Sequence, residues 1–157
     1  MQVPNSVGAD DWTGSVNAGA WGSNGANPAS SLTLSSVAEQ LIPSIFLLQQ
    51  NITIDEIQYV ASADGATTMN IHLMQYDVVT GSGSTAGDLS NGTVIAQTGS
   101  ASDSLSPITV GDDRMSNGTL TMNATNIDDG KGLIFFAENV GGTDDITVQI
   151  NFKYHLR

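Results

Sequence analysis

Pairs of neighbouring acidic residues are the first feature of the sequence with chemical potential. Three pairs recur at a constant spacing of sixteen residues, Asp112-Asp113, Asp128-Asp129 and Asp144-Asp145. If each interval is one strand plus one turn, the first and third pairs share one end of a β-sandwich and the second lies at the other. Converging carboxylates suit Ca²⁺, which takes several oxygen ligands, although no EF-hand spacing is present. The alternative is turn chemistry, in which an Asp side chain bonds nearby backbone. We expect turns and no metal.

The remaining chemistry-bearing residues do not form a recognisable catalytic set. Glycoside hydrolysis needs two carboxylates about 5–10 Å apart across a cleft, which adjacent acids in one turn do not supply. His72 and His155 are isolated and the chain has no cysteine, which argues against a zinc site. No GxSxG elbow is present, and the glycine-rich stretch at 81–87 has neither a lysine nor a following helix to hold a phosphate. We therefore predict no enzymatic activity and no cofactor.

The final stretch, DDITVQINFKYHLR, combines an alternating pattern with a concentration of cations. Apolar side chains occupy every second position over 146–156, as in a strand with one buried face. The other face ends in Lys153, His155 and Arg157, although the chain has only four Lys and Arg. These cations either form a solvated stripe, in which exposed pairs contribute about 0–1 kcal/mol each, or contact acids of a neighbouring subunit. We predict an interface, because scarce cations there would reduce repulsion between copies of net charge −12.

Short strands separated by turn clusters are predicted along most of the chain. Ile52 and Ile54 share one phase whereas Ile57 and Tyr59 share the other, which predicts a β-bulge or strand break at Asp55-Glu56. Further strands are expected at 67–79, 92–99, 105–110, 118–127, 133–140 and in the final stretch. LIFFAEN is apolar on both faces, as in a centrally buried strand. No helix is long enough for a crossover unit. The fold expected is an all-β, jelly-roll-like (Greek-key) sandwich of about seven or eight strands.

Composition limits the partners and the domain count. A chain of 157 residues is most simply one domain. Its 16 acidic against 4 basic residues argue against binding to nucleic acid or to an anionic membrane. Its most apolar stretch, at 41–48, is far shorter than the roughly 20 residues of a membrane span. Its start lacks the pattern of a secretory signal, so we expect synthesis in a host cytoplasm and release by lysis.

The N-terminal part of the chain differs from the rest. Residues 1–35 contain no Lys or Arg and few branched aliphatic residues, so they cannot offset their ordering entropy by their own burial. We assign residues 1–40 to an extended attachment arm and residues 41–157 to the jelly-roll domain. Trp12 and Trp21 either cap the domain's own core or anchor the arm on a neighbouring chain, where Trp is enriched.

From about Leu41 onward, the order of the motifs resembles small jelly-roll proteins of tailed bacteriophages, namely capsid decoration and head-fibre proteins. The motifs are an NITID opening strand, a long strand, a GTVIA strand, the turn DDGKGL and an alternating terminal strand. The resemblance covers about three quarters of the chain. It implies a homotrimer on the virion surface, with the N-terminal segment gripping the particle. It also implies contacts with the major capsid protein or neighbouring shell subunits.

We therefore expect a non-enzymatic virion structural protein, in particular a capsid decoration or cement protein. The first alternative is a receptor- or carbohydrate-binding module at a fibre tip, which would need exposed aromatic side chains. Tyr154, in phase with the buried set, counts against that alternative. The second alternative is a hydrolase, which would need a cleft with converging acids.

Overall fold

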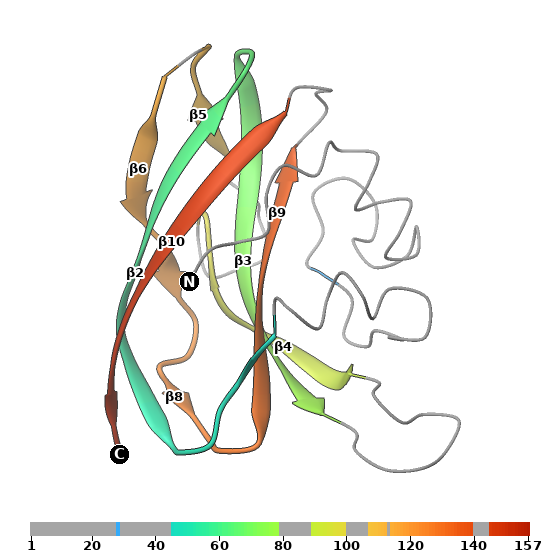
Figure 1. Cartoon of the computed structure of the whole chain (residues 1–157), viewed down its shortest axis with the longest axis vertical. Helices are drawn as coiled ribbons and strands as arrows, with labels where there is room; N and C mark the ends of the chain where they lie inside the picture. Colours follow the sequence, from blue (N-terminus) through green and yellow to red (C-terminus); the bar gives the residue numbers. More distant parts are fainter. Residues whose placement is uncertain (1–27, 29–44, 79–88, 100–106, 113, 140–144) are drawn as a thin grey trace.

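Two antiparallel β-sheets face each other in the computed structural model, which describes residues 28, 45–78, 89–99, 107–112, 114–139 and 145–157 (Figure 1). Sheet A consists of β2 (Ile52–Ala63), β6 (Ser116–Thr119), β8 (Asn126–Ile127) and β10 (Ile146–Leu156). Sheet B consists of β1 (Phe46–Leu47), β3 (Thr67–Val78), β4 (Leu89–Gln97), β5 (Ile108–Val110), β7 (Thr121–Met122) and β9 (Lys131–Asn139). The predicted all-β sandwich is confirmed, and the finer jelly-roll assignment stays a prediction. In the described part, no helix is long and apolar enough to cross a membrane.

The strand order places β2 and β3 at the centre of the two sheets. Sheet A runs β10-β2-β6, with β8 also pairing β2, and sheet B runs β1-β9-β3-β4-β7, with β5 pairing β3. Consecutive strands β2 and β3 therefore lie in different sheets. The main apolar core fills the space between the sheets, where β2 and β10 of sheet A face β3 and β9 of sheet B.

The phase change predicted at Asp55-Glu56 is a β-bulge in the long pairing of β2 with β10. Lys153 pairs Glu56, but the next residue, Tyr154, pairs Ile54, so Asp55 is the extra residue. An extra residue shifts the alternation by one position. Ile54 and Ile57, three residues apart, can therefore both point into the core, and both are fully buried.

The single strand predicted over 118–127 is wrong, because this segment passes back and forth between the two sheets. β6 pairs β2 in sheet A, β7 pairs β4 in sheet B, and β8 returns to β2. Between these strands, the Leu120 amide donates to the Ile57 carbonyl at 3.0 Å, and the Asn123 amide donates to the Ile95 carbonyl at 2.7 Å. Backbone groups of both sheets accept bonds from this segment, so it closes one side of the sandwich.

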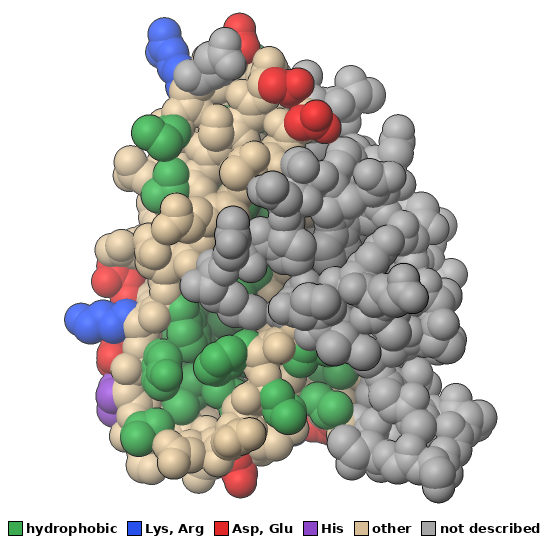
Figure 2. All heavy atoms as spheres, viewed as in Figure 1, with side chains coloured by type: hydrophobic (Ala, Val, Ile, Leu, Met, Phe, Trp, Pro, Cys, Tyr) green, Lys and Arg blue, Asp and Glu red, His purple; other side chains and the backbone are tan. Residues whose placement is uncertain are grey.

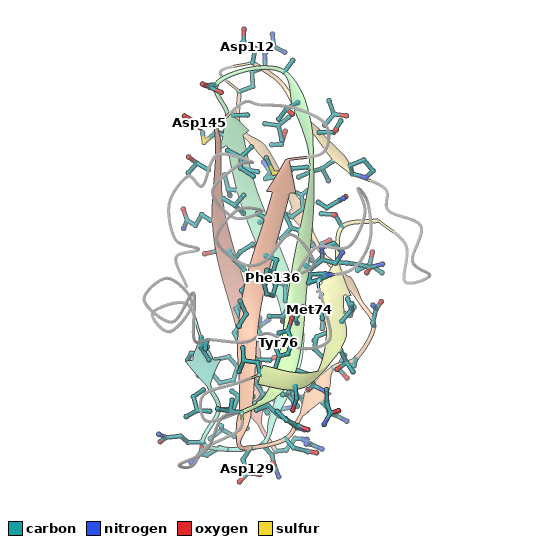
Figure 3. All side chains as sticks on the ribbon, turned by 90° about the vertical axis from the view of Figure 1, so that its right-hand side faces the viewer. Met74, Tyr76, Asp112, Asp129, Phe136 and Asp145 are labelled. Atoms are coloured by element: carbon teal, nitrogen blue, oxygen red, sulfur yellow. The ribbon has the colours of Figure 1, made fainter. Side chains whose placement is uncertain are left out.

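The centre of β3 is buried on both of its faces. Ile71 and Leu73 belong to the core between the sheets, whereas His72 and Met74 project from the opposite side of sheet B and are buried as well. The polar side chain of His72 is buried with its neighbours, because this outer face of sheet B is covered. Figure 3 views the outer face, with Met74, Tyr76 and Phe136 labelled.

Burial makes His72 sensitive to pH. Neither of its ring nitrogens has a hydrogen-bond partner among the described residues. Loss of hydration lowers the pKa of His72 from 6.5 to about 4. The unfolded chain therefore binds more protons than the folded chain between these two pH values. The free energy of unfolding is therefore highest above about pH 6.5. It falls by about 3 kcal/mol in total as the pH decreases towards 4.

We predict that His72→Leu removes this part of the pH dependence. Between pH 7 and pH 4.5 the wild-type chain should lose about 2–3 kcal/mol more of its free energy of unfolding than the variant does. Urea unfolding at the two pH values measures the difference. His155→Leu is the matched control, because the His155 side chain is 59% exposed. Equal pH dependence in wild type and His72→Leu would contradict the prediction.

Candidate functional site

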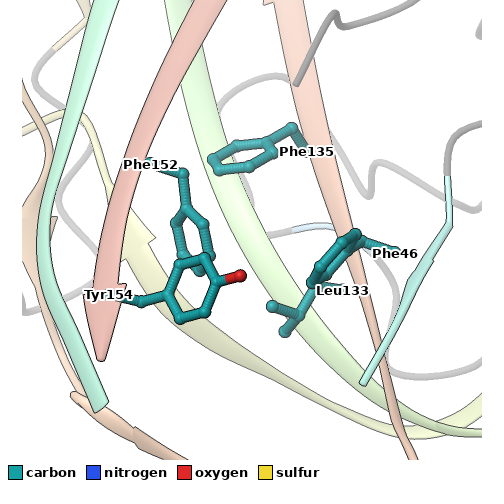
Figure 4. Close-up of a pocket in the computed structure, with 5 residues that line it drawn as sticks. All are labelled: Phe46, Leu133, Phe135, Phe152 and Tyr154. Atoms are coloured by element: carbon teal, nitrogen blue, oxygen red, sulfur yellow. The ribbon is translucent and has the colours of Figure 1, made fainter. Parts of the chain in front are cut away.

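An apolar groove opens where β10 of sheet A faces β9 and β1 of sheet B. It has a volume of about 300 Å³. Figure 4 shows the side chains of both sheets converging on it. The groove is lined by Phe46, Leu133, Phe135, Phe152 and Tyr154.

Strand alternation and register bring these five side chains together. Phe152 and Tyr154 are two residues apart on one face of β10, and their ring centroids lie 5.2 Å apart. Phe135 and Leu133 project from the inner face of β9, and Phe46 of β1 pairs directly with Leu133. The bulge in β2 matters here, because it places Tyr154 opposite Ile54 rather than opposite Asp55.

The rim of the groove carries most of the large hydrophobic side chains that are exposed in the described residues. Their exposed fractions are 39% for Phe46, 51% for Leu47, 45% for Tyr154 and 60% for Leu156. A second hollow of about 330 Å³ adjoins the groove and shares Phe46 and Tyr154 with it. Figure 2 shows hydrophobic side chains gathered on this part of the surface. We call these four residues the apolar rim.

The expectation that the whole apolar face of β10 is buried is wrong at its end. Ile146, Val148 and Ile150 are buried, Phe152 is half-buried, and Tyr154 is exposed. The phase is as predicted, since Tyr154 points into the groove (Figure 4). On the side of β9 away from β3, the described part of sheet B continues only as the two-residue strand β1. The last apolar residues of β10, Tyr154 and Leu156, remain exposed at this end.

The groove offers little chemistry for a reaction. Among its described lining residues, the only polar side-chain atom is the Tyr154 hydroxyl. A hydrolase would need converging carboxylates or a nucleophile with a base. No acidic, histidine, serine or lysine side chain of the described part lines the groove. The arrangement is therefore suited to binding an apolar surface.

The acid pairs lie at the two ends of the sandwich, as their spacing predicts. Figure 3 places Asp112 and Asp145 at one end and Asp129 at the other; their neighbours Asp113 and Asp144 are outside the described residues. The Asp145 amide donates to the Asp64 carboxylate at 2.8 Å, which joins the residue before β10 to the residue after β2. No group of three or more His, Cys, Asp or Glu side chains in the described ranges is placed to hold a metal.

Two of the three cations predicted at an interface already have acidic partners in the same chain. His155 Nδ1 lies 3.0 Å from a carboxylate oxygen of Asp55, the bulge residue. Arg157 lies 2.5 Å from Asp128, and its backbone amide donates to Asn51. Lys153 is exposed and has no ion pair within the described part of the chain. The interface role of the three cations stays a prediction, with Lys153 as its best candidate.

An ion pair holds the strands together at the start of β9, next to the groove. Lys131 pairs with Asp77 of β3, and the Asn91 side chain donates to the same carboxylate at 2.7 Å. The hydrogen bonds from Lys131 and Asn91 lower the pKa of Asp77. This contact joins β9, β3 and β4 two residues before Leu133 enters the groove.

The other predicted site residues, Trp12 and Trp21, lie outside the described residues. Sequence analysis missed Phe46, Leu133 and Phe135 as groove residues, because it treated their strands as core. The sequence did contain a signal for them. LIFFAEN is apolar on both faces of its strand, and each apolar face needs other side chains to cover it.

Comparisons of the chain with protein-family models, with curated proteins and with solved structures find no match. The functional argument therefore depends on the geometry of the groove and its rim.

We predict that calcium does not stabilise the protein. At the ends of the sandwich, the Asp64 carboxylate accepts from the Asp145 amide and Asp128 pairs with Arg157. No described group of three or more acids is placed to supply the several oxygen ligands of calcium. The melting temperature should be the same in millimolar calcium and in chelator. An increase of more than a few degrees with calcium would contradict this, because a ligand that binds only the folded state must stabilise it.

Proposed function

We propose that this chain is a non-enzymatic structural protein that assembles with copies of itself through the groove and the apolar rim. The observation that carries the proposal is the concentration of exposed large hydrophobic side chains at one opening: four of the five in the described part form the rim, and the fifth is Met115. Scattered exposed hydrophobic residues are ordinary, whereas a contiguous apolar patch marks an interaction site.

The composition of the groove favours a protein surface over a sugar. A sugar presents many hydroxyl groups, and each one buried without a hydrogen bond is unfavourable. The described lining supplies one hydroxyl, that of Tyr154. Phe and Tyr side chains with few charges are instead typical of the centre of a protein–protein interface.

Charge limits where a second copy of this chain can bind. Two copies of net charge −12 repel each other, so they approach most easily where acids are fewest. The groove has no charged side chain among its described lining residues. Lys153 lies between Phe152 and Tyr154 in β10 but projects from the opposite, exposed face of the strand. It therefore places one of the four basic residues near the groove without lining it.

The setting that we propose for this assembly is the surface of a phage-like particle. The order of strand motifs resembles that of capsid decoration and head-fibre proteins, which supports a decoration or cement role, a homotrimer and contacts with a major capsid protein. The described lining residues of the groove carry no catalytic set, and a decoration protein needs none.

The alternative of a fibre-tip module that binds a receptor or carbohydrate gains one observation. Tyr154 and Phe46 are exposed aromatic side chains beside each other at one opening of the sandwich, which is what that hypothesis requires. A glycan array with the purified chain distinguishes the two functions, since a decoration protein should bind none of the sugars.

We predict that Tyr154→Ser with Leu156→Ser weakens self-association by at least tenfold and leaves the fold intact. Both side chains are about half exposed, so their loss should change the free energy of unfolding by only about 1 kcal/mol. Sedimentation velocity over a range of concentrations measures the association. The matched control is Gln149→Ser with Asn151→Ser, on the opposite, exposed face of the same strand. A wild-type chain that stays monomeric, or a double variant that associates equally well, would overturn the proposal.

A charge series at Lys153 tests the contribution of the cation. Association should weaken in the order Lys153, Lys153→Gln, Lys153→Glu, and more strongly at low than at high salt, because salt screens charges across an interface. Lys153 is preferable to Arg157, whose replacement would also break the pair with Asp128. If all three proteins associate equally at low salt, Lys153 is a solvated residue.

A further inference from the structure

The outer face of sheet B carries a second apolar layer, separate from the core between the sheets. Register pairs Met74 of β3 with Ile134 of β9, and His72 with Phe136, so these four side chains lie on the same face. The Tyr76 ring packs edge-on against Phe136, with centroids 6.4 Å apart. All five are at most 2% exposed. Figure 3 shows Met74, Tyr76 and Phe136 on this side of the sheet.

No described strand covers this layer. Each of the ten strands belongs to sheet A or to sheet B. Sheet A packs on the inner face of sheet B, where Ile71, Leu73 and Phe135 contribute to the core. The cover of the outer face must therefore come from chain outside the ten strands.

The chain enters the described body on this outer face. The Ile45 side chain lies over Gly132 of β9: a Cβ placed on Gly132 would be 3.2 Å from Ile45 Cγ2 and 3.0 Å from Val78 Cγ2. Gly132 is the register partner of Tyr76, so Ile45 borders the outer apolar layer. β1 is antiparallel to β9. A continuation of β1 backwards along β9 from Phe46 would therefore run towards Phe136.

Length also favours the segment before Ile45. The nine residues of β9 span about 30 Å. The link over 79–88 has to leave Val78 and return to its partner Leu89, so it reaches only about 17 Å from that end, whereas His72 lies about 20 Å along β3. The 44 residues that precede Ile45 can extend over about 140 Å.

The composition of this segment suits a neutral apolar cover. Residues 1–44 contain three charged residues, Asp10, Asp11 and Glu39. Pro28, the one described residue of this part, is buried. Its Trp, Leu and Ile side chains are Trp12, Trp21, Leu32, Leu34, Leu41 and Ile42.

We propose that the N-terminal segment, residues 1–44, docks on the outer face of sheet B in its own chain and forms a third layer over Met74, Tyr76, Ile134 and Phe136. This assigns the segment a role within the domain, in place of the attachment to another protein expected from its composition. Of the two roles that the sequence leaves open for Trp12 and Trp21, packing in their own chain follows.

Methionine methyl groups provide the test in the intact chain. The protein labelled with ¹³C at its methionine methyls gives five signals, one for each Met. The Met74 methyl should show nuclear Overhauser contacts with protons of residues 1–44, such as indole or leucine methyl protons. The Met69 methyl is the matched control, because it is equally buried but lies in the core between the sheets. It should show contacts with the sandwich alone.

A mixture of labelled and unlabelled copies separates contacts within a chain from those between chains. Contacts between Met74 and residues 1–44 should come entirely from the labelled copy's own chain. Contacts seen only between copies would overturn the proposal in favour of an exchanged segment. Contacts of Met74 with residues 79–88 or 100–106 and with none of residues 1–44 would overturn it as well. Tryptophan fluorescence gives a second test without labels. Trp12→Phe leaves Trp21 as the only tryptophan, and Trp21→Phe leaves Trp12. In each variant, acrylamide should quench the remaining tryptophan several-fold less in the folded than in the urea-unfolded chain. Equal quenching in both states would contradict packing in the chain's own domain.

Discussion

The pairing of β10 with β2, with its single extra residue at Asp55, is the contact on which the rest of the structure depends. It joins the last strand to the centre of sheet A over eleven residue pairs. Without the bulge, one of Ile54 and Ile57 would point to solvent, and Tyr154 would face Asp55 rather than Ile54. The same bulge turns the Asp55 carboxylate towards His155 on the outer face. One local irregularity therefore determines the core of sheet A, the aromatic side of the groove and the partner of His155.

The outer face of sheet B and the apolar rim are both apolar surfaces outside the main core, but they differ in exposure. The buried surface contributes to folding, whereas the exposed one is available for association. Side chains of the outer face of sheet B are almost fully buried, as are those of an ordinary core. Their burial already stabilises the folded chain, so they have little left to offer a partner. Rim side chains keep about half of their surface exposed. A partner that covers them gains the remaining apolar burial, which makes the rim the surface suited to assembly.

The alternation of apolar and polar residues was enough to predict most strands, but not which strands pair with each other in the sheets. β3, β9, β10 and the bulge follow from alternation and from the phase change between Ile54 and Ile57. The segment 118–127 was not predictable as three strands, because its pairing depends on which sheet edges lie beside it. The same limit applies to His72 and Tyr154. Phase gives the face on which a side chain lies, whereas exposure depends on what covers that face: the polar-phase His72 is buried and the apolar-phase Tyr154 is exposed.

The basic residues at the chain end show why the candidate site could be predicted only in part from the sequence. The concentration of cations at the chain end is visible in the sequence, but their partners depend on the fold: Asp55 is the bulge residue, and Asp128 follows β8. Lys131 is similarly engaged by Asp77. Sixteen acids against four bases leave most carboxylates without a basic partner in the chain. Attraction between charges is therefore a weak basis for assembling copies of this protein, and apolar contact at a surface with few acids is the stronger one. The groove and its rim meet that condition, and Lys153, on the opposite face of β10, adds a cation nearby that reduces the repulsion between copies.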